Sequence, residues 1–345
     1  RGTKVVDSKH GGITQGIGAY QVSHQDNLIT FQCPVCKAGF LEEKTDNNGE
    51  SILKCNNCNE KFPVIFDIPR LTSLENYSAS FGFQWNKYQA TQLDSYTKTR
   101  ISEDRIKKAT FWDDLNDVSG NILEAGSGAG RFTEVLTKTS ANVYSFDYSN
   151  AVEANYKNNG ESTNLKIFQG DIFNIPFKDD EFDHVFCLGV IQHTPNPEKA
   201  FKSLAQKVKP GGYLYIDHYA FKWHHIFSWQ YMLRPITKRI KKETLYNIIS
   251  KVVPKLIPVS RIARKYLGRL GSRLIPIVEF SHLGLDKSIN EEWAILDTFD
   301  IYSPEHDHPQ TISTIKTWFQ EISFDNVSVF YGDNGIVAQG RKPLK

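Results

Sequence analysis

The chain has 345 residues, of which 40% are hydrophobic and 23% are charged, and its formal net charge at pH 7 is +2. This composition is that of a globular protein and excludes a collagen-like, low-complexity or disordered chain. Its apolar runs fall far short of the roughly 20 residues that a membrane-spanning helix needs. A chain of this length accommodates one large domain together with a smaller one.

The first stretch predicts no packed element. Residues 1–27 are rich in Gly, Ser and Gln and show no apolar periodicity. We expect a weakly ordered lead-in, and its pattern is not that of a signal peptide.

Four of the five cysteines form two Cys-x-x-Cys pairs, Cys33 with Cys36 and Cys55 with Cys58, with 18 residues between the pairs. Two such pairs supply four thiolates to one tetrahedral zinc ion, and this closed set of ligands is typical of a structural site. Two disulfides or a redox pair are the alternatives, but nothing else in the sequence suggests secretion. We predict a zinc ribbon over residues 28–70 and, because its thiols are reduced, a cytoplasmic protein.

An aromatic stretch and a helical run follow the ribbon. The aromatic stretch, "FGFQWNKYQATQLDSY", extends from Phe81 to Tyr96, and the run over 102–116 has acids near its start, as helices do. We expect residues 71–119 to form a helical linker whose aromatic part is a lid over a bound ligand.

From residue 121 onward, short apolar runs alternate with segments of helical periodicity. Strands are predicted at 121–125, 142–147, 165–171, 183–189 and 212–217, and helices at 131–139, 150–159 and 197–208. Pro197 suits the first turn of the last of these helices. The alternation predicts a mostly parallel sheet with helices on both faces.

A basic segment interrupts this pattern after the fifth strand. Residues 221–280 hold 13 Lys and Arg and two acids, a charge of +11, which leaves −9 for the rest of the chain because the total is +2. We expect a helical insertion over 221–296 that acts as a substrate cap and meets something anionic. The pattern resumes with a helix over 311–322 and two apolar runs joined by a short turn at 332–335, which predicts an antiparallel hairpin.

The loop "ILEAGSGAGRFTE", residues 122–134, joins the first strand of the sheet to a helix. Such a glycine loop fits a dinucleotide, whose pyrophosphate sits on the helix N-terminus, or a nucleoside cofactor without pyrophosphate. The acids around it favour the second interpretation. Glu124, Asp147 and Asp171 end three successive strands, and they suit a cationic sulfonium and ammonium, two ribose hydroxyls and an adenine amino group. These are the groups of S-adenosylmethionine.

Several stretches in order, "ILEAGSGAGRFTE", "VYSFDYS" and "GDIFNIPFKDDEFDHVFCLGVIQHTPNPEKAFKSLAQKVKPGGYLYI", resemble the motifs of class I S-adenosylmethionine-dependent methyltransferases of the type 11-like group. The ribbon resembles the Trm112-like ribbon of methyltransferase activator proteins. The resemblance implies a Rossmann-like α/β fold: a seven-stranded, mostly parallel sheet with an antiparallel last strand, formed by residues 120–220 and 297–345.

The same resemblance implies a set of cofactor-binding residues. They are Glu124, Gly126, Gly128, Gly130, Asp147, Tyr148, Asp171, Ile172, Leu188 and Gln192. It also places His193, which follows the fourth strand, near the methyl group. A neutral histidine there is suited to remove a proton from the acceptor, although it also has a simpler interpretation as a hydrogen-bonding residue of its loop. Residues expected at the same edge of the sheet, and therefore near the acceptor, are His218, Tyr219, Asp300, Tyr302 and His306.

We therefore predict a methyltransferase acting on an O or N of an anionic small molecule, such as a sugar nucleotide, a lipid-linked glycan or a secondary metabolite. One alternative is an rRNA or tRNA base methyltransferase that uses the ribbon and the basic insertion, since RNA is also anionic. Another is a non-catalytic partner protein that binds S-adenosylmethionine. The basic, aromatic segment 221–280 additionally predicts peripheral contact with a membrane.

Overall fold

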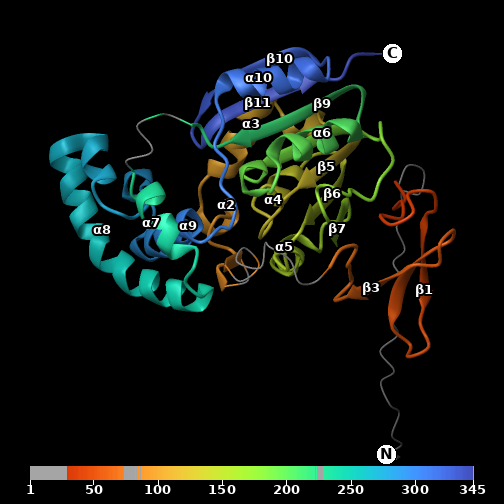
Figure 1. Ribbon diagram of the computed structural model, residues 1–345, viewed down its shortest axis with the longest axis horizontal. Coiled ribbons are helices and arrows are strands. Elements are labelled where there is room, and N and C mark those ends of the chain that lie inside the picture. The colour runs from red at the N-terminus through yellow and green to blue at the C-terminus, as the bar shows by residue number, and fades with distance from the viewer. Residues whose placement is uncertain are drawn as a thin grey trace, which may run out of the picture.

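The computed structural model describes residues 29–73, 82, 84, 85, 87–221, 223 and 228–344. The predicted lead-in over 1–27 lies outside these residues, as do parts of the lid and of the insertion. The described chain forms a small four-stranded sheet, a seven-stranded sheet and a group of helices. Figure 1 shows the large sheet in the middle, with the small sheet and the helical group at opposite ends.

The large sheet has the strand order β10–β11–β9–β8–β5–β6–β7. Its strands are β5 (Asn121–Ala125), β6 (Asn142–Asp147), β7 (Leu165–Gln169), β8 (Phe182–Leu188), β9 (Val208–His218), β10 (Asp325–Gly332) and β11 (Gly335–Arg341). β5 to β9 run parallel, whereas β11 is antiparallel to β9 and to β10. The predicted mostly parallel sheet with an antiparallel end is thus confirmed. The strand order reverses between β5 and β8, and ligands bind at the carboxyl ends of strands beside such a reversal.

Apolar residues of alternating strand positions build a core on each face of the sheet. Ile122 packs with α3 (Ile101–Thr110) and α4 (Thr133–Leu136), whereas Leu123 faces the core shared by α6 (Pro197–Lys207) and α10 (Ile312–Glu321). α2 (Asp94–Thr97) precedes α3, and α5 (Val152–Asn159) packs near β7. α4 is shorter than the predicted helix because the glycine loop and its turn take up the preceding residues.

Side-chain caps explain where two of these helices begin. Asn196 Oδ1 accepts a hydrogen bond from the Lys199 amide at 3.0 Å, and Pro197 occupies the first turn of α6. Thr311 Oγ1 likewise accepts from the Thr314 amide at 3.1 Å at the start of α10.

The helical group, which we call the cap, consists of α7 (Trp229–Thr237), α8 (Lys242–Arg273) and α9 (Lys287–Tyr302). The inner face of α8 buries apolar side chains against α9, whose Phe299 and Tyr302 complete this core. Because these two residues belong to the cap, the helical unit extends past the predicted boundary at residue 296. Within the described residues, no helix combines the length and apolar content of a membrane span.

The small sheet holds β1 (Leu41–Thr45), β2 (Ser51–Cys55), β3 (Lys61–Ile65) and β4 (Ile68–Pro69) in that order. It lies beside the edge strand β7, where Arg70 forms a parallel bridge with Gln169 and the Phe31 ring meets the Phe168 ring edge-on at 5.0 Å. The small sheet and its flanking residues therefore cover an edge that would otherwise present unpaired backbone groups.

Candidate cofactor and acceptor site

A cavity of about 620 Å³ lies between the carboxyl edge of the large sheet and the cap. The strand ends contribute Gly126, Asp147, Leu188 and Tyr219 to its wall, and α9 contributes Asp297, Asp300 and Ile301. Its size lies within the range of about 300–1,000 Å³ that is typical of small-ligand sites. The cavity therefore sits at the reversal of strand order, where a ligand of the parallel sheet is expected.

The glycine loop forms one wall, and its backbone excludes side chains for steric reasons. Gly126 has φ +78°, and a Cβ there would lie 2.3 Å from Val190 Cγ2; Gly128 has φ +53° and lies against the Trp85 ring. Gly126 and Gly128 line the cavity. Gly130 instead packs beneath the loop, because a Cβ there would lie 2.2 Å from Asn155 Oδ1. The loop is thus a cradle that brings a ligand against bare backbone.

The three acids predicted around the loop have different positions. Asp147 lines the cavity, and its carboxylate accepts hydrogen bonds from the Gly128 amide at 2.9 Å and from the Ser149 amide and hydroxyl at 2.8 and 2.7 Å. Burial raises the pKa of Asp147. Its two oxygens are therefore held in place at the end of β6, beside Tyr148, which also lines the cavity.

Glu124 lies behind the loop and not on the cavity wall. Its Oε2 accepts hydrogen bonds from the Thr133 hydroxyl at 2.6 Å and the Ser145 hydroxyl at 2.7 Å. Burial raises the pKa of Glu124 to about 7. In this structure the carboxylate ties β5 to β6 and to the first residue of α4.

Two further predicted residues also lie off the cavity wall. Asp171 Oδ1 accepts from the Phe173 amide at 2.9 Å and so closes its own turn, whereas the neighbouring Ile172 lines the cavity. Gln192 is fully buried, and its amide has no hydrogen-bond partner among the described residues. The structure therefore brings Gly126, Gly128, Asp147, Tyr148, Ile172 and Leu188 together around the cavity, but not Glu124, Gly130, Asp171 or Gln192.

Two arginines that the sequence did not single out also line the cavity. Arg105 of α3 forms an ion pair with Asp217 of β9, and Asp217 also accepts from the Gly189 amide. Arg131, directly after the glycine loop, donates to Gln92 Oε1 at 2.8 Å, while Gln92 Nε2 donates to Asp297 Oδ1 at 3.0 Å. These contacts join the loop, the linker and the cap. Of the three residues, only Arg131 adjoins a recognisable sequence motif.

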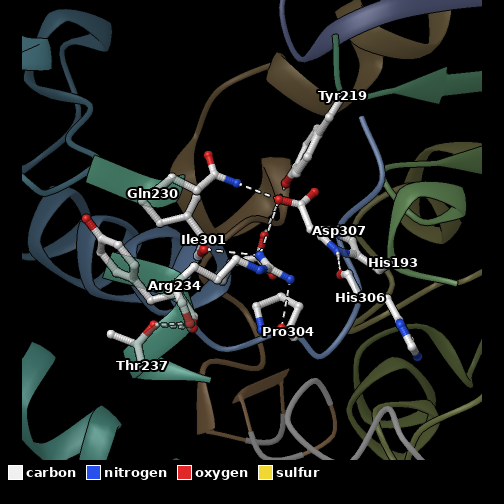
Figure 2. A network of polar contacts seen from close by, with 11 residues as sticks. His193, Tyr219, Gln230, Arg234, Thr237, Ile301, Pro304, His306 and Asp307 are labelled. Atoms are coloured by element: carbon white, nitrogen blue, oxygen red, sulfur yellow. Dashed lines mark hydrogen bonds and ion pairs between the residues drawn. The ribbon is translucent and has the colours of Figure 1, made fainter. Parts of the chain in front are cut away.

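The side of the cavity where the acceptor is predicted is lined by His193 and Tyr219 (Figure 2). Asp300 lines the same cavity. His193 Nδ1 lies 3.1 Å from the His306 carbonyl oxygen, and its ring meets the Tyr219 ring edge-on at 5.3 Å. Tyr219 donates its hydroxyl to Asp300 Oδ2 at 3.3 Å. Since a carbonyl only accepts, Nδ1 carries the proton of the neutral imidazole, and Nε2 carries the lone pair.

Burial sets the protonation of these groups. It lowers the pKa of His193 to about 4 and raises that of Asp300 to about 6 and that of Asp297 to about 7. His193 is therefore neutral at pH 7, and the two aspartates titrate close to neutrality. Titratable groups shifted in this way inside a cavity are typical of functional sites.

A buried arginine of the cap holds the segment that positions His193. Arg234 donates to the Pro304 carbonyl at 2.7 Å and pairs with Asp307 at 3.3 Å, and Gln230 donates to Asp307 at 2.9 Å (Figure 2). The His306 carbonyl lies between these anchors. His306 therefore contacts the site through its backbone carbonyl and not through its side chain. Its ring stacks on that of His308, with centroids 5.8 Å apart.

His218 and Tyr302 lie outside the cavity wall. His218 is fully buried with Nδ1 3.2 Å from the Tyr219 carbonyl oxygen, and burial lowers its pKa to about 4. Tyr302 donates to the Pro276 carbonyl at 3.1 Å within the cap. Both side chains support neighbouring elements instead of facing the cavity.

The four predicted metal ligands converge. Sγ atoms of Cys33 and Cys58, and of Cys36 and Cys55, lie 3.7 Å apart, and all four lie within 4.8 Å of one another. Four sulfurs about 2.3 Å from a tetrahedral zinc ion lie about 3.8 Å apart, whereas a disulfide would bring two to about 2.0 Å. Amides of Asn57 and Cys58 donate to Cys55 Sγ at 3.4 Å. The geometry and donor set fit a structural zinc ion.

Comparisons with known proteins agree with this architecture. Residues 123–216 match the family model described as a methyltransferase domain. The chain contains a methyltransferase domain. Its family supports S-adenosylmethionine as the cofactor, as predicted, and this domain contains the glycine loop and Asp147.

Curated relatives match less than a third of this chain. The ubiquinone biosynthesis O-methyltransferase of Coxiella burnetii is 34% identical over 99 residues, 28% of this chain and 42% of the relative. The tRNA U34 carboxymethyltransferase of Campylobacter curvus is 29% identical over 106 residues, 30% of this chain and 36% of the relative. A solved S-adenosylmethionine-dependent methyltransferase of Methanosarcina mazei has 16% identity and a TM-score of 0.40, covering 70% of this chain and 98% of its own. The chain thus spans less than half of these curated relatives.

Proposed function

We propose that the protein transfers a methyl group from S-adenosylmethionine to an oxygen or nitrogen of a small molecule with an anionic part. The continuous cavity supports this most strongly. It runs from the glycine loop and Asp147 to His193 and Tyr219, so one space holds a cofactor cradle and groups suited to an acceptor.

The cofactor end of the cavity suits a nucleoside that carries positive charge. Bare backbone at Gly126 and Gly128 would allow close contact, and the carboxylate of Asp147, which already accepts from the Gly128 amide, would accept hydrogen bonds from ribose hydroxyls. The bound sulfonium supplies an activated methyl group with a good leaving group. The protein then mainly aligns the acceptor and excludes water.

His193 is our candidate for the general base. With the cofactor bound, the acceptor oxygen or nitrogen would bond to the methyl carbon as the carbon–sulfur bond broke, and His193 Nε2 would take the acceptor's proton. A weak base suffices, because this proton becomes strongly acidic as the new bond forms. The contact with the His306 carbonyl fixes the tautomer that this step requires.

The anionic part of the substrate would meet arginines of the cavity wall. Arg105 is neutralised by Asp217, whereas Arg131 makes its described hydrogen bonds to the neutral Gln92 and Ser102. Arg273, at the end of α8, is exposed and lines the cavity. Arg131 and Arg273 are thus the candidates to pair with a carboxylate or phosphate.

The structure weakens the RNA alternative. Figure 1 shows the ribbon and the cap at opposite ends of the molecule, so they do not form one continuous basic surface. α9 forms part of the cavity wall, and a base within an RNA chain would have to enter beside this helix. A non-catalytic cofactor-binding protein would not need His193 and Tyr219 inside the same cavity.

Two measurements test the proposal. Calorimetry should detect binding of S-adenosylhomocysteine to the wild type and its loss in Gly126→Ala, whose Cβ would lie 2.3 Å from Val190 Cγ2. Gly284→Ala is the matched control and should bind as the wild type, because Gly284 has a similar φ of +72° but a Cβ there would meet no atom within 4 Å. Tight NADH binding without S-adenosylhomocysteine binding would refute the assignment.

Incubation with methyl-labelled cofactor and fractionated cell extract then identifies the acceptor pool. We expect label in small molecules and a loss of about a hundredfold to ten-thousandfold in kcat for His193→Asn, with cofactor affinity unchanged. Label in RNA would favour the alternative. An undiminished kcat in His193→Asn would remove His193 from the reaction.

A further inference from the structure

The long helix α8 has two apolar faces. Its inner face packs against α9 through Leu245, Tyr246, Ile249, Val253 and Ile257. A second set lies 42–77% exposed: Ile248, Val252, Val259, Ile262 and Tyr266. At about 100° per residue this second set falls within an arc of about 80°, so it forms one stripe along the outside of the cap.

Exposed cations lie within this stripe and along one side of it. They are Lys251, Lys255, Arg261 and Lys265, and the turn before α8 adds Lys238, Arg239 and Lys241. Among the described residues, no acidic side chain forms an ion pair with any of these seven. Within α8 itself Glu243 is the single acid. The outward surface therefore combines an apolar stripe with uncompensated positive charge.

Other parts of the cap also expose apolar side chains. α7 presents Met232 and Ile236, 55% and 64% exposed, and the residues beyond the break at Gly268 present Leu270 and Leu274, 64% and 55% exposed. Transfer of such exposed aliphatic side chains from water to a lipid environment is favourable.

We propose that this surface docks on an anionic lipid bilayer, with the stripe at the boundary between headgroups and acyl chains and the lysines among the headgroups. A basic amphipathic helix with an apolar face is the pattern of such interfacial binding. The proposal goes beyond the reaction and does not depend on it. α7 and α8 also supply Gln230, Tyr231 and Arg273 to the cavity wall, so docking would bring the cavity and the lipid surface together.

Two other occupants fit less well. RNA would engage the cations but leave the aliphatic stripe in water, because single-stranded nucleic acid is held by cations and aromatic stacking. A second copy of the chain, joined stripe to stripe, would set one row of lysines against the other and so create like-charge repulsion.

Vesicle co-sedimentation of the full chain tests the proposal. We expect binding to phosphatidylcholine vesicles that contain about 30 mol% phosphatidylglycerol, little binding to pure phosphatidylcholine, and weakening with salt. Replacing Lys251, Lys255 and Lys265 together with Gln should reduce the affinity about a hundredfold, since each lysine near an anionic surface contributes about fivefold. The matched control replaces the exposed Lys61 of β3, Lys138 after α4 and Lys316 of α10, none of which belongs to the cap, and should bind as the wild type.

A second variant tests the apolar stripe. Ile262→Gln with Tyr266→Ser retains every charge and should reduce vesicle binding about tenfold or more, because the removed apolar area no longer enters the lipid. S-adenosylhomocysteine binding, measured in parallel, verifies that each variant is folded. Equal binding to both vesicle types, or full binding by this variant, would overturn the proposal. So would retention of labelled RNA in place of vesicles, or a dimer in solution that the same variant dissolves.

Discussion

The buried ion pair between Arg105 and Asp217 gives the sharpest stability prediction. Asp217 has 1% of its side chain exposed and Arg105 has 17%. Asp217→Asn keeps the size and the acceptor for the Gly189 amide but leaves the guanidinium without its counter-charge. Breaking a buried pair in this way costs about 3–5 kcal/mol, and we expect the lower value because Arg105 retains some contact with water. At about 2 °C per kcal/mol for a chain of this size, the melting temperature should fall by about 6 °C.

Differential scanning calorimetry of matched variants measures this effect. Asp333→Asn removes an ion pair with Lys108 whose side chains are 80% and 44% exposed, and it should shift the melting temperature by about 1 °C or less. Adding Arg105→Met to Asp217→Asn removes the unpaired charge and should recover most of the loss. Two results would contradict this reasoning: Asp217→Asn melting no lower than Asp333→Asn, or the double variant melting lowest of all. Either result would mean that the unpaired charge of Arg105 does not cause the loss of stability.

Two further predictions concern protonation and metal. Because burial raises the pKa of Glu124 from 4.5 to about 7, the folded state binds this proton more tightly than the unfolded state, so this group's stabilisation is complete below pH about 4 and is lost as pH rises toward 7. The free energy of unfolding of Glu124→Gln, measured in urea, should therefore rise by up to about 3 kcal/mol relative to that of the wild type as the pH goes from 4 to 8. If the two proteins show the same pH dependence, the prediction is wrong. Elemental analysis should find one zinc per chain, lost in Cys55→Ser and retained in Cys187→Ser, whose thiol is buried outside the ribbon; an equal metal content in both variants would exclude the four-cysteine site.

The sheet and the ribbon were predictable because their signals are local. Short apolar runs between helical segments define the parallel strands, and the turn before Gly335 joins β10 to β11 through residues that are adjacent in sequence. The cysteine spacing alone predicts the metal site, because two Cys-x-x-Cys pairs supply the four thiolates of a tetrahedral zinc ion. Each of these inferences needs only a few consecutive residues.

The inward and outward directions of the strand-end acids were not predictable in the same way. Glu124 and Asp147 each lie near the carboxyl end of a strand, yet Asp147 faces the cavity whereas Glu124 accepts hydrogen bonds from Thr133 and Ser145. The orientation of Glu124 depends on hydroxyl donors that two other elements bring beneath the loop. The partner of Arg105 lies 112 positions away in sequence, and nothing local to either residue identifies the other.

The sequence predicts a pocket whose acidic side chains favour a cationic cofactor. In the structure a different set of acidic residues lines the cavity. Asp147 alone represents the three predicted acids on the cavity wall, but the cap adds Asp297 and Asp300, which lie on the same wall. Asp217 neutralises Arg105, and Lys108 neutralises Asp333, so neither of these lining residues changes the balance. Burial is the main cause of the raised pKa values of these three carboxyl groups, and Arg131 and Arg273 also line the cavity. A pyrophosphate beside the three carboxyl groups would add negative charge to a buried acidic cluster. A sulfonium and an ammonium would lower those pKa values and be stabilised in return, which is why the cap, as much as the glycine loop, favours a cationic cofactor.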